Sequence, residues 1–223
     1  METMKGSWQY IQDNPDRFLD ALSVHVRLSL YAFFAAILIS IPIGILASRS
    51  RRMGPALVAA VAAVRVIPSI AVLFLLYPYR KEIGVFFPTL DRSFSLALVA
   101  LTLLAAPSIV INTDAGLRSV DLPILENARG LGMNAIQVFL RVQLPLALPV
   151  IVAGFRTAAV EVFASATLAA FVGAGSLGRF ITSGLTLLDY RLLLVGAIPV
   201  TLLALTAEAV LAGIERLTKL GVR

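Results

Sequence analysis

Five charged residues interrupt the long apolar runs of this chain: Arg65, Asp114, Arg156, Glu161 and Glu208. If these runs lie in a membrane, a charge near mid-bilayer costs about 2.5–3.5 kcal/mol and has to face a cavity or an opposite charge. Arg65 and Glu161 are the better candidates for a transport pathway, with a structural ion pair as the alternative for each. Arg156 and Glu161 do not share a helix face at their spacing, so each is expected to meet another helix or a second subunit. Asp114 and Glu208 lie near span ends and are expected to be solvated.

Little else in the sequence could do catalysis or bind a metal. The chain has no cysteine, which excludes disulfides, thiol nucleophiles and cysteine-bound metals. An intramembrane enzyme would need several converging catalytic side chains, and the single histidine, His25, has no evident partner. We therefore expect no catalytic residue and no metal site in this chain.

The pattern Gly173-x-Gly175-x-x-Gly178 formally matches a dinucleotide-binding fingerprint. That fingerprint requires a preceding β-strand, and here the glycines follow an apolar run without strand character, so nucleotide binding is rejected. Glycines at membrane depth can instead break a helix where protein or a cavity lines the break, which would place a gate at the outer end of a pathway. Close packing of helices through small residues is the alternative.

The elements that must carry these residues are predicted to be membrane helices. Apolar residues make up 59% of the 223 positions, whereas a soluble domain has roughly 45–50%. A helix needs about 20 residues to cross the bilayer core, and five runs are long enough. We expect an all-α membrane protein with one membrane domain over residues 21–215. The expected spans are Leu22–Ala47, Pro55–Tyr77, Phe94–Ala115, Leu144–Ala166 and Leu192–Ile214.

The distribution of basic residues predicts the orientation of these spans. Five spans place the first loop, the third loop and the tail on one side, and each carries three basic residues, as cytoplasmic segments do. The N-terminus is then outside and residues 216–223 form a cytoplasmic tail. This distribution accounts for the net charge of +6 without nucleic acid as a partner. Residues 1–20, with Trp8, Tyr10 and Phe18 among charges, are expected to form an outer interfacial helix, or else a partly ordered tail.

The segment between the third and fourth predicted spans, residues 121–142, is too polar to cross a membrane. Its pattern predicts a short helix capped by Asp121, a turn at Gly130 and Gly132, and a second helix that leads into the fourth span. We call this segment the hook. Its apolar side chains have to be buried, either against the protein's own spans or in a socket on a partner. The two predicted apolar faces are Ile124, Leu125 and Ala128, and Ile136, Phe139 and Leu140.

The hook resembles the EAA motif of permease subunits of ABC-type importers. The matching residues are Glu126-Asn127-Ala128, Gly132 four positions later, and Val142-Gln143-Leu144-Pro145, with Asn127 and Val142 as mild departures. Three further pieces resemble the branch that imports glycine betaine, carnitine or choline. They are Ile67-Pro68-Ser69-Ile70-Ala71, Asn112-Thr113-x-x-Gly116-Leu117, and residues 166–178, which read ATLAAFVGAGSLG. The methionine-importer branch shares only the last of these well.

This resemblance implies the fold of a type I ABC importer permease, with five membrane helices and a cytoplasmic coupling hook. It implies a cytoplasmic ATPase dimer that binds ATP and Mg²⁺ and receives the hook, and an external substrate-binding protein. This chain itself would bind no cofactor, since it has no phosphate loop. The implied coupling residues are Glu126, Asn127, Ala128, Gly132, Leu144 and Pro145. The candidate pathway or gate residues are Arg65, Pro68, Ser69, Asn112, Glu161, Gly173, Gly175 and Gly178.

Five spans are too few to enclose a pathway, so a second permease chain, identical or homologous, is expected beside this one. The expected location is the cell (inner, cytoplasmic) membrane, with the lipid bilayer as a further partner. A methionine-type importer is the alternative function. A secondary transporter would need inverted repeats and a paired-charge ion site, and no repeat is evident in the sequence.

Overall fold

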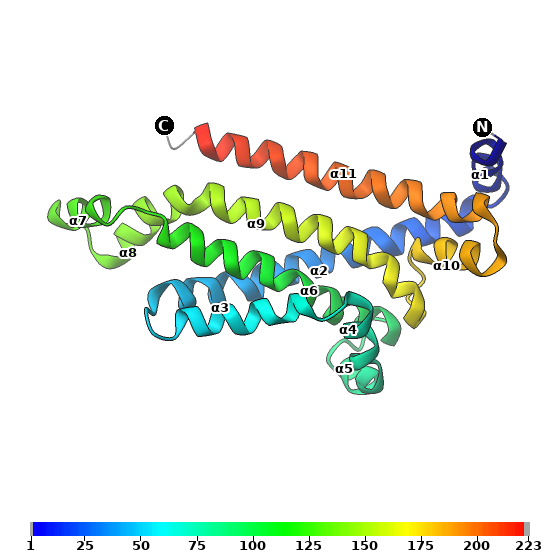
Figure 1. Cartoon of the computed structure of the whole chain (residues 1–223), viewed down its shortest axis with the longest axis horizontal. Coiled ribbons are helices and arrows are strands. Elements are labelled where there is room, and N and C mark those ends of the chain that lie inside the picture. Colours follow the sequence, from blue (N-terminus) through cyan, green and yellow to red (C-terminus); the bar gives the residue numbers. More distant parts are fainter. Residues whose placement is uncertain (1, 221–223) are drawn as a thin grey trace.

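The structure, a computed structural model, describes residues 2–220, and these residues form helices without any β-strand. Residue 1 and residues 221–223, the extremities of the expected N-terminal segment and tail, lie outside the described part. Four long helices run side by side along the molecule, with the hook at one end and the N-terminal helix at the other (Figure 1). The helices are α1 (Glu2–Asp13), α2 (Pro15–Arg49), α3 (Gly54–Ala63), α4 (Ser69–Leu76), α5 (Arg80–Phe86), α6 (Arg92–Arg118), α7 (Leu122–Gly130), α8 (Ala135–Val138), α9 (Leu144–Ser165), α10 (Gly178–Leu187) and α11 (Tyr190–Leu220).

Four of the five predicted spans are confirmed as long apolar helices. Helices α2, α6 and α11 are each long and apolar enough to cross a membrane, and so is the stretch Ala135–Val172, which contains α8 and α9. Each of them extends beyond the apolar run from which it was predicted, because the flanking residues continue the helix.

The predicted span Pro55–Tyr77 is not one straight helix, because the chain turns in the middle of it. The segments Gly54–Val66 and Ser69–Phe86 meet at an angle of 94°, so they are one broken span at most. Pro68 has no backbone N–H and disfavours helical geometry at the residue before it. Ile67 accordingly takes an extended conformation, with φ −77° and ψ 125°.

Helix α6 is the centre of the bundle. Two thirds (67%) of its apolar span is buried, against 17% for α11, which therefore lies at the periphery. The buried face of α6 alternates large and small side chains such as Leu101, Ala105 and Ile109, all fully buried. Small residues let the neighbouring backbones of α2 and α9 approach closely, which is how helices pack in a membrane.

The N-terminal residues form a helix and not a loose tail. Helix α1 lies across the end of the bundle next to the start of α11 (Figure 1). Ser7 is buried there and donates a hydrogen bond of 2.9 Å to the carbonyl oxygen of Arg191. Trp8 is exposed. Helix α2 begins at Pro15, so it runs across the expected boundary between residues 20 and 21.

Candidate functional site

The hook turns at Gly132 alone. Gly132 has a φ of +85°, a left-handed conformation that glycine adopts without steric cost, whereas Gly130 is still the last residue of α7. Asp121 lies at the expected cap position but makes no side-chain capping bond. The second helix is capped instead, by reciprocal hydrogen bonds of 2.9 Å between Asn134 and Gln137. This capping box was missed, although the spacing Asn-x-x-Gln was visible in the sequence.

The hook buries part of its apolar surface within itself. Leu125 and Ala128 of α7 pack against Val138 of α8, and all three are buried. The hook is therefore a small folded unit that does not need the spans to cover this face. Ile124, predicted to lie on the same apolar face, is exposed in this chain. The apolar side chains that remain exposed on the hook are Leu122, Ile124, Leu131, Ile136 and Leu140.

Hydrogen bonds anchor the base of the hook to the bundle. The Arg118 guanidinium donates to the carbonyl oxygens of Ala47 and Ser50 at 2.7 and 3.2 Å, which ties the end of α6 to the end of α2. Gln143 donates to the carbonyl oxygen of Leu117 at 3.0 Å. Asp114 was expected to be solvated, but its carboxylate pairs with Arg118 at 2.8 Å.

The residues of the EAA-like motif are divided between the surface and the interior of the hook. Glu126, Asn127 and Gly132 are exposed, and Ala128 is buried in the small core described above. Leu144 and Pro145 open α9, which follows the second hook helix without a turn through the π-helical residues 139–143. The second hook helix and the membrane helix α9 therefore form one continuous helical segment.

The three glycines of the rejected nucleotide motif form the expected helix break. After residues 166–172, which form a 3₁₀ helix, Gly173 and Gly175 take positive φ values of 83° and 74°. Gly178 serves close packing instead, because a Cβ atom there would lie 1.9 Å from the Thr167 carbonyl oxygen. The glycines therefore include both a helix break, at Gly173 and Gly175, and a close packing contact, at Gly178. Ser176 secures the loop by donating to the carbonyl oxygen of Ala166 at 2.8 Å.

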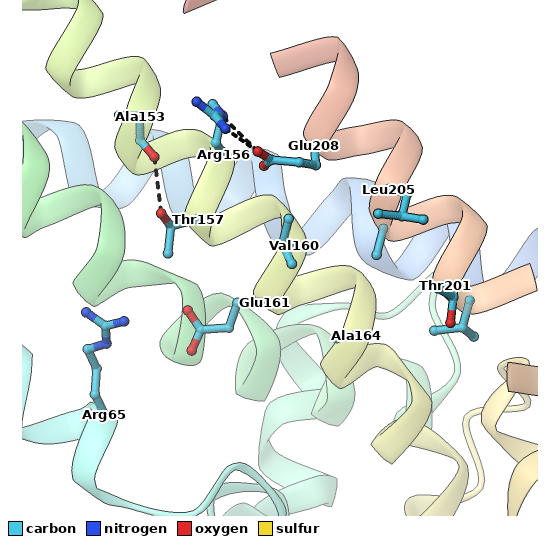
Figure 2. Close-up of a pocket in the computed structure, with 12 residues that line it drawn as sticks. Arg65, Ala153, Arg156, Thr157, Val160, Glu161, Ala164, Thr201, Leu205 and Glu208 are labelled. Atoms are coloured by element: carbon cyan, nitrogen blue, oxygen red, sulfur yellow. Dashed lines mark hydrogen bonds and ion pairs between the residues drawn. The ribbon is translucent and has the colours of Figure 1, made fainter. Parts of the chain in front are cut away.

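Four of the five charged residues within the apolar runs gather at one cavity. It has a volume of about 830 Å³ and lies between α9, α11 and the 3₁₀ turn Val64–Val66 that precedes the break at Pro68. Figure 2 shows Arg65 and Glu161 on one part of its wall and Arg156 and Glu208 on another. We call it the charged cavity.

The charges in this cavity differ in their partners. Arg156 forms ion pairs with Glu208 and Glu215, both on α11, so it meets another helix as expected. Glu208, expected to be solvated, is paired with Arg156 and keeps 35% of its side chain exposed. Glu161 accepts a hydrogen bond of 3.2 Å from the Ser108 hydroxyl of α6. Neither Arg65 nor Glu161 belongs to an ion pair within residues 2–220.

Several other candidate pathway residues lie away from the charged cavity. Pro68 forms the break and Ser69 begins α4, but neither lines the cavity. Asn112 donates at 2.7 Å to the carbonyl oxygen of Ser108 on its own helix, α6. Gly173 and Gly175 line a separate cavity of about 380 Å³, next to the N-terminal end of α6. Within residues 2–220, no group of three or more His, Asp or Glu side chains converges in a way that could hold a metal ion.

A bundle of membrane helices with a hook leading into one of them is the architecture of a transport permease. The family model of the binding-protein-dependent transport system inner membrane component matches residues 31–220. The chain belongs to this family, and it is the membrane-spanning component of such a transport system.

Individual relatives match over almost the whole chain. The carnitine transport permease protein OpuCB of Listeria monocytogenes is 39% identical over 96% of this chain and 94% of its own. The choline transport system permease protein OpuBB of Bacillus subtilis is 35% identical, over 93% of this chain and 91% of its own. The glycine betaine/carnitine/choline permease OpuCB of Bacillus subtilis is 34% identical, over 96% and 94% respectively.

Solved structures share the fold. An inward-facing structure of the MetNI methionine ABC transporter matches with a TM-score of 0.78, at 22% identity over 90% of this chain and 95% of that one. An amino acid ABC transporter solved with histidines matches with a TM-score of 0.74, at 19% identity over 94% and 97%. The fold of an ABC importer permease, expected from the sequence, is confirmed.

Proposed function

We propose that this chain is the permease subunit of an ABC importer for a quaternary ammonium osmoprotectant such as glycine betaine, carnitine or choline. The observation that carries this proposal is the identity of 34–39% to permeases named for these solutes, over almost the full length of both chains. Sequence motifs in three separate places, including the break at Pro68 and the glycine loop after α9, support the same assignment.

Coupling to ATP hydrolysis would run through the hook. Its exposed apolar side chains, including Leu131 and Ile136, are a suitable surface for a groove on a cytoplasmic ATPase dimer, which binds the ATP and Mg²⁺. Glu126, Asn127 and Gly132 form the centre of that contact in this proposal, and the buried Ala128 supports them from within the hook. The small internal core and the anchors to α2 and α6 support its action as a rigid lever.

The proposed assembly has this chain beside a second permease chain, identical or homologous. The hook and the C-terminal end of α11 face the cytoplasm, and α1 faces the outside, where a substrate-binding protein delivers the solute. Closure of the ATPase dimer displaces the hook, and α9 moves with it because the two are continuous. The pathway then alternates between two states whose populations depend on nucleotide.

Reconstituted transport tests the cargo assignment. The permease, its ATPase and its binding protein are placed in vesicles, and uptake of labelled glycine betaine, carnitine, choline, proline and methionine is measured with and without ATP. We expect ATP-dependent uptake of at least one quaternary ammonium solute. Uptake of methionine alone would replace the proposal with the methionine-type importer, and ion-driven uptake without ATPase would replace it with a secondary transporter.

A pair of glycine variants tests the coupling role of the hook. Gly132→Ala forces a side chain into a left-handed conformation, at about 1–2 kcal/mol, so the hook should lose affinity for the ATPase by roughly 5- to 30-fold. Gly130→Ala is the matched control, because Gly130 is helical and a Cβ atom at either glycine meets nothing within 4 Å. Co-purification of the ATPase with each variant is the measurement. Equal retention of the ATPase by both variants would contradict a coupling role for the shape of the hook.

A further inference from the structure

The charged cavity contains two groups of charged side chains. Those of one group form ion pairs with each other, and those of the other group do not. At one end, Arg156 is bonded to two carboxylates of α11. Toward the other end, the side chains of Arg65 and Glu161 point toward one another across the cavity (Figure 2). No ion pair joins them, and Arg65 donates no hydrogen bond to any residue of the described range 2–220. Their charges are therefore available to a molecule that enters the cavity.

The signs of the two open charges select a class of ligand. A simple cation is attracted by Glu161 but repelled by Arg65, and a simple anion meets the reverse. A molecule that carries both charges close together satisfies both side chains. The planar guanidinium of Arg65 is also suited to bind a carboxylate through two parallel hydrogen bonds.

The residues that line the cavity further restrict the class of ligand that it can bind. None of the residues that line it in the described part of the chain is aromatic, so a quaternary ammonium cannot be held there by an aromatic cage. Apolar side chains, Val160, Ala164 and Leu205, line the cavity as well and are suited to contact methyl groups. The aromatic residue Phe155 of the same helix packs edge-on against Phe33 instead. Recognition in this cavity has to rely on charge.

The position of the two side chains links the cavity to motion. Arg65 lies two residues before Ile67, where the broken span changes direction by 94°. Glu161 lies on α9, which is continuous with the second helix of the hook. A change in the angle of the broken span, or a shift of the hook, therefore alters the separation of the two charges. A ligand that bridges them is held in one state and released in the other.

We propose that Arg65 and Glu161 form a transient site, within the translocation pathway, for a small zwitterionic solute with a quaternary ammonium group and a carboxylate. This inference rests on the proposed importer function and deepens it. The volume of about 830 Å³ exceeds that of one such solute, in keeping with passage and not with tight binding. The permease would then add its own selection to that of the binding protein, in favour of zwitterions over simple cations.

Glycine betaine and choline are matched probes, because both carry a trimethylammonium group and only glycine betaine carries a carboxylate. Uptake of each is measured in vesicles that contain the complete transporter, with the binding protein saturated and ATP inside. Arg65→Gln should lower glycine betaine uptake by roughly tenfold, the effect of one lost charge-assisted contact, and leave choline uptake unchanged or raised. Glu161→Gln should lower uptake of both solutes. Arg52→Gln, an exposed arginine in the turn between α2 and α3, is the matched control and should change neither.

The outcomes separate this inference from the proposed function. Equal effects of Arg65→Gln on the two solutes, or no effect on either, overturn the zwitterion site while the importer function stands. A wild-type complex that takes up no quaternary ammonium solute with ATP overturns the proposed function and the site with it. ATPase activity stimulated by loaded binding protein reports whether each variant assembles. If Arg65→Gln does not assemble, Arg65→Ala decides, and an unchanged ratio of glycine betaine to choline uptake overturns the site.

Discussion

Two arginines, Arg65 and Arg156, reach the same cavity, and their surroundings differ. Arg156 bridges Glu208 and Glu215, two turns apart on one face of α11, and Lys219 also pairs with Glu215 at 2.6 Å. This cluster joins α9 to the peripheral helix α11. Arg65 is exposed and unpaired within residues 2–220, on the segment just before the break at Pro68. One cluster thus holds helices together, and the other is open toward a cavity between helices.

The difference shows that charged side chains at membrane depth can have two roles. Some hold helices together, and others are available to a transported solute. An ion pair between helices satisfies the requirement that a charge in a membrane have a partner, and it leaves nothing for a solute. An open pair at a cavity satisfies the same requirement only with water or cargo. Residue type alone does not distinguish these two cases. The melting temperature and the uptake of variants in each cluster do distinguish them.

The largest decrease in melting temperature is expected for Arg156→Ala. This change leaves Glu208 and Glu215 without the guanidinium between them, and Glu215 is largely buried, with 9% of its side chain exposed. The Arg156 side chain is itself 31% exposed, and Glu215 keeps its ion pair with Lys219, so the loss of stability is partial. We expect the largest drop in melting temperature among these variants. Arg65→Ala is the comparison and should leave the melting temperature near that of the wild type. A similar drop for both variants would contradict the view that Arg156 has a structural role and Arg65 does not.

A smaller decrease in melting temperature is expected for Glu208→Gln. Arg156 keeps its ion pair with Glu215, and the glutamine oxygen can still accept a hydrogen bond. The decrease in melting temperature should be less than half of that for Arg156→Ala. Cross-linking between cysteines introduced on α9 and α11 would check that the two helices stay together. Loss of the α9–α11 contact in this variant would show that Glu208, and not Glu215, is the main partner.

The smallest effect is expected for Ser108→Ala. The hydroxyl donates a hydrogen bond of 3.2 Å to Glu161, and such bonds contribute about 0.5–1.5 kcal/mol. Uptake should fall by less than about tenfold, with the same ratio of glycine betaine to choline as in the wild type. Its melting temperature should fall by only a few degrees, since one hydrogen bond is lost. A loss of uptake as complete as that of Glu161→Gln would mean that the hydroxyl itself contacts cargo.

Much of the fold could be predicted because membrane helices are determined by local composition. Four apolar runs became helices at the predicted places. The turn at Gly132 was also predictable, since a positive φ favours glycine. The break at Pro68 was predictable in principle, because proline and its preceding residue carry the signal, but the apolar run around it concealed the signal. The capping of α8 by Asn134 was missed although it is local in sequence.

The partners of the charged side chains could not be predicted in the same way. The distance along the chain between Arg156 and its carboxylates is more than 50 residues, and only the packing of α9 on α11 brings them together. The same packing determines that Leu125 is covered by Val138 while Ile124 of the same helix stays exposed.

The sequence by itself determined the membrane helices, the hook between the third and fourth apolar runs, and the glycine positions where helices end, because these follow from composition and backbone geometry within a few residues. The tertiary structure alone decided which charges of different helices are paired, because such an ion pair depends on how the helices pack. It therefore also decided that Arg65 and Glu161 face a cavity without a salt bridge between them.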